Sequence, residues 1–295
     1  MLNHIRAAFE DGERIVVLGA RGFLGTAVCK RLAPENVTVI PLGSADIDLA
    51  EAGAADKLAA LLRPGDALVM LSALTPDKGR DAATVIKNIL MMQNVCVALA
   101  DARCAHFVYV SSDAVYGSKT SLITEQTPPS PEDLYGAMHL SRELMARSIS
   151  RVPVLLLRPT AIYGADDTHN GYGPNRFRRT AAAEGRILLF GGGEEMRDHV
   201  YVDDVAALTA RCLARRSAGT LNVATGNSRS FSDVATLVSR HFRVPVSVTS
   251  LPRAAAITHR HFDITNLVKA FPGFRFVSLV EGLARVHHNM STRPQ

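Results

Sequence analysis

RIVVLGARGFLG (residues 14–25) joins an apolar run to the start of a helix-forming segment. The apolar residues predict a buried strand, and Gly19, Gly22 and Gly25 follow it at the spacing G-x-x-G-x-x-G. In such a turn the first glycine permits tight bending, the second lets a pyrophosphate approach the backbone, and the third lets helix and strand pack closely. The helix N-terminus adds N–H groups and a positive dipole end. The segment therefore predicts a dinucleotide site, with a purely structural turn as the alternative.

Four further apolar runs follow along the chain, at residues 37–40, 66–73, 106–111 and 152–157. They alternate with segments of helical periodicity, at residues 25–32, 52–62, 81–102 and 135–150. Because the apolar runs are continuous rather than alternating, both faces of their sheet should be covered by helices. This order of elements predicts an α/β fold with a doubly wound parallel sheet, which is a Rossmann lobe.

The character of the sequence changes after Pro159, where residues 165–174 are rich in Gly, Asp and Asn. Such turn chemistry predicts a loop, and shorter elements follow it. We therefore expect a dinucleotide-binding Rossmann lobe over residues 1–164, to which a segment near residues 200–225 returns. Residues 165–295 should form a smaller C-terminal lobe that mainly binds substrate.

The composition excludes several classes of protein. Apolar residues make up 47% and charged residues 21%, which is usual for a globular chain and not for a disordered one. No apolar run approaches the ~20 residues of a membrane-spanning helix, and residues 1–13 lack the pattern of a secretory signal. The net charge of +5 favours an anionic small molecule over nucleic acid. The cysteines lie far apart without metal-ligand spacing, so we expect reduced thiols, no metal and a cytoplasmic location.

The choice of dinucleotide depends on the end of the second predicted strand. An NAD site usually has Asp or Glu about 20 residues past the glycine turn, to bind the ribose 2′-hydroxyl. Here residues 39–44 contain no acid, and Asp46 is the first. Arg21 is placed to bind a 2′-phosphate, so we favour NADP over NAD, with a solvated surface position for Arg21 as the alternative. The predicted cofactor residues are Gly19, Arg21, Gly22, Phe23, Leu24, Gly25, Asp48, Leu49, Ser72 and Ala73.

VSSDAVYG (residues 110–117) leaves a predicted strand, and YGAMH (residues 135–139) opens a predicted helix. Further strings match in family order, at residues 158–164, 197–205, 221–223 and 263–284. Over nearly its whole length the chain resembles the extended short-chain dehydrogenases/reductases, the nucleotide-sugar epimerase/dehydratase family. The resemblance implies that Ser112 hydrogen-bonds the reacting sugar oxygen and that Tyr135 transfers the proton, opposite a nicotinamide that transfers hydride. Without catalysis, Ser112 would cap a turn and Tyr135 would pack on the sheet.

His139 stands where the family has the lysine of a Tyr-x-x-x-Lys motif. Positions i and i+4 share one helix face, so His139 should lie beside Tyr135. The lysine of the family binds the nicotinamide ribose, so the resemblance implies that Tyr135 and His139 belong to both the catalytic and the cofactor site. A neutral histidine stabilises tyrosinate less than a lysine does, by about tenfold for each pKa unit lost. Oxidation of an alcohol needs tyrosinate, whereas reduction of a ketone needs neutral tyrosine. The substitution should therefore impair oxidation more than reduction.

Dehydratases and decarboxylases of this family carry Glu two places after the catalytic Ser or Thr, where this chain has Ala114. The resemblance thus favours an NAD(P)-dependent epimerase or ketoreductase of a nucleotide-linked sugar. The alternatives are a cofactor-binding protein without turnover, serving regulation or assembly, and a reductase of a non-sugar carbonyl compound. Family members hold the nucleotide diphosphate near the positions of Asn175 and Arg197. The predicted substrate-binding residues are Asp113, Asn175, Arg176 and Arg197.

The predicted helix 81–102 carries an apolar stripe, formed by Val85, Ile89, Met92 and Cys96. Members of the family usually pair this helix and the helix of Tyr135 across a two-fold axis, as a four-helix bundle. The resemblance therefore implies a homodimer. Burial of the stripe against the chain's own sheet is the alternative.

Overall fold

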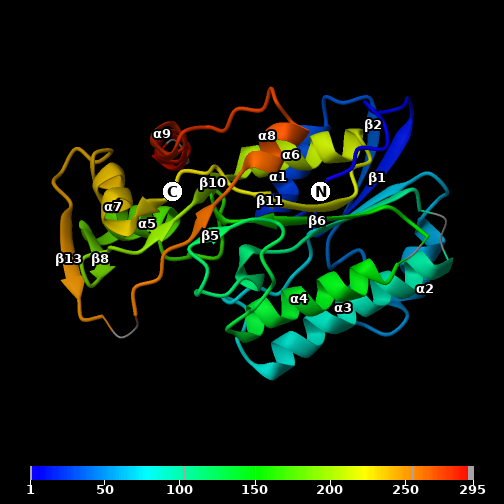
Figure 1. Ribbon diagram of the computed structural model, residues 1–295, viewed down its shortest axis with the longest axis horizontal. Coiled ribbons are helices and arrows are strands. Elements are labelled where there is room, and N and C mark those ends of the chain that lie inside the picture. The colour runs from blue at the N-terminus through cyan, green and yellow to red at the C-terminus, as the bar shows by residue number, and fades with distance from the viewer. Residues whose placement is uncertain (1, 102–103, 150, 254–255, 292–295) are drawn as a thin grey trace. The chain divides into compact units, whose positions relative to one another are not determined.

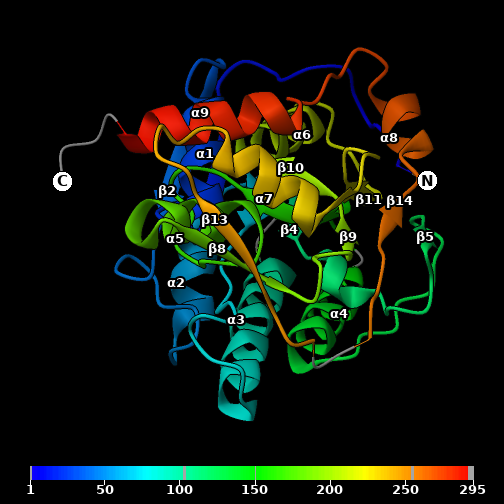
Figure 2. The ribbon, with the colours of Figure 1, turned by 90° about the vertical axis from the view of Figure 1, so that its left-hand side faces the viewer.

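The computed structural model describes residues 2–101, 104–149, 151–253 and 256–291 (Figures 1 and 2). Its chain forms two compact units. Unit 1 consists of Met1–Gly117, Thr127–Pro159 and Val205–Val223. Unit 2 consists of Ser118–Gln126, Thr160–Asp204 and Ala224–Gln295.

Unit 1 is built on a six-stranded sheet with the strand order β11-β6-β4-β3-β1-β2, and all of its pairs are parallel. The strands are β1 (Glu13–Leu18), β2 (Val37–Leu42), β3 (Ala67–Met70), β4 (His106–Val110), β6 (Val154–Pro159) and β11 (Gly219–Val223). Helices α1 (Phe23–Leu32) and α6 (Val202–Ala214) cover one face, and α2 (Ala54–Leu61), α3 (Ala82–Asp101) and α4 (Leu134–Arg147) cover the other (Figure 1). Every residue of β4 is buried, as a strand covered on both faces requires. The predicted doubly wound α/β fold is confirmed.

The order of the strands determines where a ligand can bind in unit 1. The chain passes from β1 to β2 on one side and then returns to β3 on the other side of β1. Open α/β sheets bind ligands outside the carboxyl ends of their strands at such a reversal. The glycine turn leaves the carboxyl end of β1, and residues 71–74 leave β3, which pairs with β1. The reversal therefore brings both segments to one edge of the sheet.

Helix α4 begins at Asp133, whose carboxylate accepts a hydrogen bond from the Gly136 amide at 2.7 Å. Tyr135 consequently lies in the first turn of α4, and His139 follows one turn later on the same face. A Cβ atom on Gly136 would collide with the carbonyl oxygen of Ala114, which belongs to the 3-10 turn η1 (Asp113–Val115) after β4. Glycine at position 136 thus lets the start of α4 pack directly on this turn.

Unit 2 contains short pairs of strands and four helices among the residues that the structure describes. The parallel pairs are β7 (Ala161–Tyr163) with β10 (His199–Tyr201), β8 (Arg186–Phe190) with β13 (Ser247–Leu251), and β5 (Leu122–Ile123) with β14 (His261–Phe262). The antiparallel pair is β9 (Met196–Arg197) with β12 (Arg229–Ser230). The helices are α5 (Pro174–Glu184), α7 (Phe231–Ser239), α8 (Thr265–Ala270) and α9 (Leu279–Ser291).

The structure divides the two units after Pro159, whereas the sequence predicted a boundary after residue 164. The second segment of unit 1 ends at Pro159 and its third, Val205–Val223, lies where the returning segment near residues 200–225 was predicted. Residues 118–126 belong to unit 2 although they precede α4 in the chain. The reason is a long-range pairing, because β5 at residues 122–123 forms a strand pair with β14 at residues 261–262. The helices predicted over 81–102 and 135–150 are present as α3 and α4, and their predicted last residues lie outside the described part of the chain.

Helix α3 is the longest helix of the described chain and has two kinds of surface. Met92 is fully buried in the core of unit 1, whereas Ile86 is 59% exposed and Val97 is 45% exposed. Over Ala82–Ala100 the helix is long and apolar enough to cross a membrane, with a mean hydropathy of 1.4, a test that core helices of water-soluble proteins also pass. Lys87, Asn88, Gln93 and Asn94 interrupt its apolar residues, so this result does not contradict the expectation that no continuous apolar run reaches that length.

Candidate functional site

The glycine turn after β1 is held tightly between its neighbours. Gly19 has φ of +82°, and a Cβ atom there would lie 2.9 Å from the Ser72 amide nitrogen. A Cβ atom on Gly25 would collide with the Gly19 carbonyl oxygen. Gly22 is the N-cap of α1 and offers no side chain to its first-turn amides. The turn therefore leaves helix N–H groups open to an anion, and no larger residue fits at positions 19 and 25.

A cavity of about 390 Å³ adjoins this turn at the carboxyl edge of the sheet. Seven predicted cofactor residues line it: Gly19, Arg21, Gly22, Asp48, Leu49, Ser72 and Ala73. Sequence reasoning missed seven other lining residues: Gly43, Ser44, Ile47, Leu71, Leu74, Lys78 and Met91. The remaining predicted cofactor residues do not line it: Phe23 and Leu24 open α1, Gly25 is buried beneath the turn, and Tyr135 and His139 lie on α4.

Arg21 reaches from the glycine turn to the end of β2. Its guanidinium hydrogen-bonds both carboxylate oxygens of Asp46, at 2.9 and 3.1 Å. Its side chain passes so close to Gly43 that a Cβ atom there would lie 3.1 Å from Arg21 Cδ. The Gly43 amide also donates to Asp46, at 2.8 Å. Asp46, which sequence reasoning noted only as the first acid after β2, is thus the partner of Arg21.

Ser112 and Tyr135 are brought together at the carboxyl end of β4. Ser112 caps η1, where its Oγ accepts from the Ala114 amide at 3.1 Å, and its hydroxyl, as a donor toward the Tyr135 phenol, lowers the pKa of that phenol. Burial raises the pKa of Tyr135 to about 12, and the Asp113 carboxylate acts in the same direction. The Ser112 hydrogen bond and the charge of Arg142 act in the opposite direction. Tyr135 is therefore a neutral phenol at pH 7.

His139 is buried beside Tyr135, with the two rings edge to face and their centroids 4.6 Å apart. Its Nδ1 is hydrogen-bonded to the Tyr109 hydroxyl at 2.6 Å, whereas its Nε2 has no partner among the described residues. Burial, reinforced by the charge of Arg142, lowers the pKa of His139 well below its usual value. His139 is therefore a neutral imidazole at pH 7 and supplies no positive charge to Tyr135.

Two features of unit 1 fit a bound dinucleotide. The glycine cradle leaves backbone close to the space that a pyrophosphate would occupy, and a side chain at position 19 would be sterically excluded. His139 Nε2 is a buried polar atom without a partner in the described structure, which a ribose hydroxyl would satisfy. The residues that would hold the cofactor are therefore the turn of Gly19 to Gly25, the segments after β2 and β3, and His139.

The predicted substrate-binding residues of unit 2 have separate roles in the structure. Asn175 is buried in α5, and its Oδ1 accepts from the Gly164 amide at 3.1 Å. The Arg197 guanidinium donates to the Thr258 carbonyl at 2.6 Å and to its hydroxyl at 2.9 Å. Arg176 is exposed beside a cavity of about 140 Å³. No cavity described for unit 2 contains all three residues, and Asp113 lies in unit 1.

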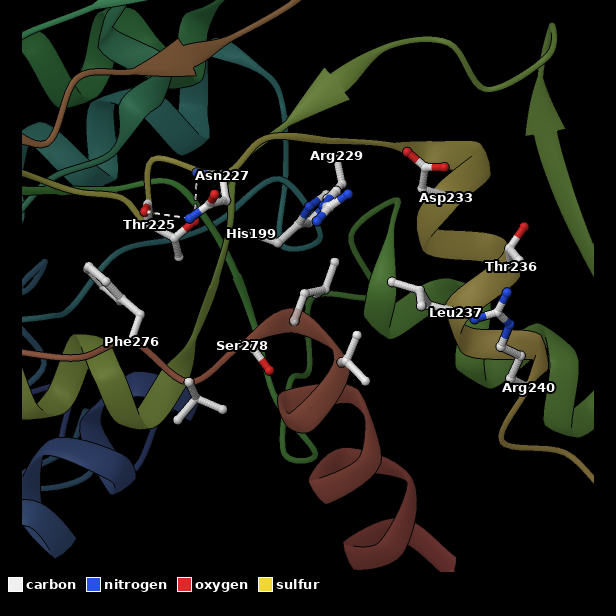
Figure 3. A pocket seen from close by; sticks show the side chains of 13 residues that line it. His199, Thr225, Asn227, Arg229, Asp233, Thr236, Leu237, Arg240, Phe276 and Ser278 are labelled. Carbon is white, nitrogen blue, oxygen red and sulfur yellow. Dashed lines mark hydrogen bonds between the residues drawn. The ribbon is translucent and has the colours of Figure 1, made fainter.

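Unit 2 also has a larger cavity, of about 500 Å³, which none of the predicted residues lines (Figure 3). Arg229, Asp233, Thr236 and Arg240 border it from β12 and α7, and Ser278 borders it at the start of α9. Four of these residues lie within positions 229–240 and Ser278 comes from a distant segment, and no motif in the sequence marks them.

Comparison with known proteins agrees with this architecture. The family model described as NAD dependent epimerase/dehydratase family matches residues 15–224. The dTDP-L-rhamnose 4-epimerase of Burkholderia thailandensis is 25% identical over 332 aligned residues, which cover 90% of this chain and 91% of that protein. The UDP-glucose 4-epimerase of Thermus thermophilus, solved with NAD, has a TM-score of 0.82 at 20% identity, covering 95% of this chain and 99% of that chain. A GDP-L-fucose synthetase from Naegleria fowleri, bound to NADP, has a TM-score of 0.85 at 18% identity, covering 99% of both chains.

Proposed function

Because the chain belongs to the NAD-dependent epimerase/dehydratase family, we propose that it is an enzyme that epimerises or reduces a nucleotide-linked sugar, with Tyr135 as the proton carrier. The observation that carries this proposal is that Ser112 and Tyr135 are brought together, because Ser112 caps η1 and Gly136, next to Tyr135, packs against the Ala114 carbonyl of the same turn. Ser112 and Tyr135 stand at the carboxyl edge of the sheet, where the glycine turn also lies. The names of the relatives support the substrate class, since they act on dTDP- and UDP-linked sugars.

The raised pKa of Tyr135 determines the protonation state from which each direction of the reaction starts. When bound, the nicotinamide cofactor supplies or accepts the hydride. Tyr135, neutral at pH 7, is ready to donate its proton to a ketone oxygen, and the Ser112 hydroxyl holds the phenol in place. In the oxidative direction the phenol must first lose its proton. Because the pKa is about 12, the fraction of Tyr135 present as phenolate falls about tenfold for every pH unit below that value. At pH 7 the site is therefore ready to donate a proton, whereas oxidation must begin with the loss of one.

Arg21 supports NADP as the preferred cofactor. A 2′-phosphate at the end of β2 would meet the Arg21 guanidinium, which already lies there against Asp46. Guanidinium groups bind phosphates through paired, charge-assisted hydrogen bonds. Lys78 also lines this cavity and adds a second positive charge. Asp46 opposes the phosphate, so NADP binding requires Arg21 to exchange the carboxylate for the phosphate.

Turnover and cofactor-binding measurements test the enzymatic activity and the preference for NADP. The protein is incubated with NADPH or NADH and a panel of UDP-, dTDP- and GDP-linked sugars and 4-keto sugars, and products are followed by mass spectrometry and cofactor absorbance. We expect turnover of one member, and tighter binding of NADPH than of NADH. Arg21→Ser should raise the Kd of NADPH about 10- to 100-fold and that of NADH far less, because one charge-assisted interaction is lost. Cofactor binding without turnover of any member would contradict the enzymatic proposal, and equal effects of Arg21→Ser on both cofactors would contradict the NADP preference.

We also propose that a second copy of the chain covers the exposed apolar surface of α3 and α4. The prediction that the apolar stripe of α3 forms the dimer surface is wrong for Met92, because this side chain lies in the core of the chain's own unit. The exposed apolar residues lie one position further round the helix, at Ile86, Leu90 and Val97. Leu144 of the neighbouring α4 is 61% exposed. Exposed apolar side chains on two adjacent helices are typical of a protein interface.

Ile86→Glu combined with Leu144→Glu is expected to convert a dimer into a monomer, because four buried carboxylates would have to lose water at a two-fold interface. Sedimentation velocity of the purified chain at micromolar concentration measures the change. Val244→Glu is the matched control, since Val244 is 75% exposed in unit 2. A wild-type monomer would contradict the proposal, and binding of that monomer to lipid vesicles would instead identify α3 as a membrane contact.

A further inference from the structure

Arg142 carries a positive charge into the core of unit 1. Its side chain is completely buried, and it forms an ion pair with no carboxylate of the described chain. The adjacent Glu143 is turned away and binds Arg158, at 2.6 and 2.8 Å. Burial lowers the pKa of Arg142, but a guanidinium stays protonated in proteins. An unpaired buried charge lowers the stability of the fold. We therefore expect Arg142 to have a role in function rather than in stability.

The direct contacts of Arg142 are with neutral groups. Its guanidinium donates to the Ser72 carbonyl at 2.8 Å and to Asn88 Oδ1 at 3.3 Å. It lies over the ring of Tyr109, 4.9 Å from the ring centroid, and its Nε has no partner in the described structure. These contacts orient the guanidinium without neutralising it. Asn88 is itself fixed, because its amide binds the carbonyl oxygen of Leu74 at 3.0 Å and that of Thr84 at 3.1 Å.

The groups around Arg142 that can become anions are two phenols and a thiol. The charge of Arg142 lowers the pKa values of Tyr109, Tyr135 and Cys96, against burial, which raises all three. Tyr109 is held in its neutral form by its hydrogen bond to His139 and by complete burial. Tyr135 is the one of the three that also bonds the Ser112 hydroxyl.

Several other groups face Tyr135, and they do not supply positive charge. Asp113 of η1 and Asp133 at the start of α4 both raise the pKa of its phenol. Ser112 is a neutral donor, and His139 is a neutral imidazole. Among the groups that act most strongly on Tyr135, Arg142 is therefore the only cation. It lies two turns further along α4, on the side of the helix that packs against α3.

We propose that Arg142 is a positioning residue that supplies the fixed positive charge for Tyr135 in its base form, while neutral His139 holds the ring and the ribose. The inference rests on the proposed function. In the oxidative step the substrate C–H bond breaks, and its electron pair passes as hydride to NAD(P)⁺. The carbonyl forms, and the substrate hydroxyl proton passes to the Tyr135 phenolate. Arg142 stabilises that phenolate, which is the form that precedes oxidation and follows reduction, so its charge sets the pH at which Tyr135 becomes a base.

Arg142→Met tests the charge with little change of volume. We expect the midpoint of the pH profile of the oxidative kcat/KM to move up by one unit or more, which corresponds to a phenolate fraction at least about tenfold lower at any fixed pH below the midpoint. Arg142→Lys should keep most of the oxidative rate. Arg147→Met is the matched control on the same helix, because Arg147 is exposed and binds Thr220. A lower rate with an unchanged midpoint of the pH profile would show a merely structural role and overturn the proposal.

A second cation at position 139 provides the rescue experiment. His139→Lys combined with Arg142→Met should restore oxidation to at least the wild-type rate, because the lysine would place a charge one turn from Tyr135. A packing defect would not respond to this change. Failure of the double variant to recover, with a melting temperature like that of Arg142→Met, would contradict the proposal.

Tyrosinate absorbance separates this inference from the proposed function, since it needs no turnover. The chain has no tryptophan and six tyrosines, so phenolate formation is visible without indole background. In a His139→Lys background, the difference titration against the matching Tyr135→Phe variant reports Tyr135 alone. Adding Arg142→Met should raise the midpoint by a unit or more, whereas adding Arg147→Met should not. An unchanged midpoint overturns the role of Arg142 even in a chain without detectable turnover.

Discussion

Tyr135→Phe is expected to lower the rate of sugar epimerisation or reduction by about 10²- to 10⁴-fold, the usual contribution of a positioned proton donor. The phenol oxygen is the only atom removed, and its ring would keep the edge-to-face contact with His139. The melting temperature and the Kd of the cofactor should therefore change little. The rate is measured at saturating cofactor with the nucleotide sugar that the substrate panel identifies.

Tyr201→Phe is the control for this variant, because it removes a phenol oxygen from unit 2. Its rate should stay within twofold of wild type. If Tyr135→Phe kept more than a tenth of the activity, another group would have to carry the proton, and the hydrogen bond with Ser112 would be structural.

Glu143→Ala is expected to reduce the free energy of unfolding by about 3–5 kcal/mol, because it leaves a buried guanidinium without its counter-ion. Glu143 and Arg158 are both almost fully buried and form two hydrogen bonds, at 2.6 and 2.8 Å. Arg158 also donates to the Tyr116 hydroxyl at 2.7 Å, and that hydroxyl donates to Asn222 at 2.8 Å. The network links α4, β6 and β11, so its loss weakens the whole edge of the sheet.

Urea unfolding followed by circular dichroism measures this loss. Glu281→Ala is the matched control, since its pair with Arg285 is about half exposed and should contribute less than about 1 kcal/mol. The double variant Glu143→Met with Arg158→Met should be more stable than Glu143→Ala, because no charge remains buried. A loss below about 1 kcal/mol for Glu143→Ala would mean that water reaches Arg158 in solution.

Local patterns were sufficient for the fold of unit 1. The apolar run before Gly19 and the spacing of Gly19, Gly22 and Gly25 have one common structural solution, because steric contact excludes a side chain at the first and third glycines. The next four strands of the sheet are continuous apolar runs that follow helical segments. The pairing of β5 with β14 had no such pattern, because two-residue strands about 140 positions apart carry no periodicity.

In the candidate site, too, some features could be predicted from the sequence and others could not. Ser112, Tyr135 and His139 could be named from motifs, because each motif lies in one short segment of the chain. That His139 would be neutral at pH 7 also followed from its ordinary chemistry. The bond of its Nδ1 to Tyr109 was not predictable, since β4 and α4 meet only when the sheet forms.

Arg142 is the clearest example of a residue whose environment the sequence did not predict. In the sequence it is one of many basic residues, and a basic residue on a helix is usually solvated. Its effect depends on complete burial between α3, α4 and β4, which removes water and lets one charge act on two phenols. Short-range chemistry along the chain thus established the sheet and the glycine turn, and it singled out the proposed proton carrier. The electrostatic setting of that carrier arose only where distant segments packed together, because burial is a property of the assembled core.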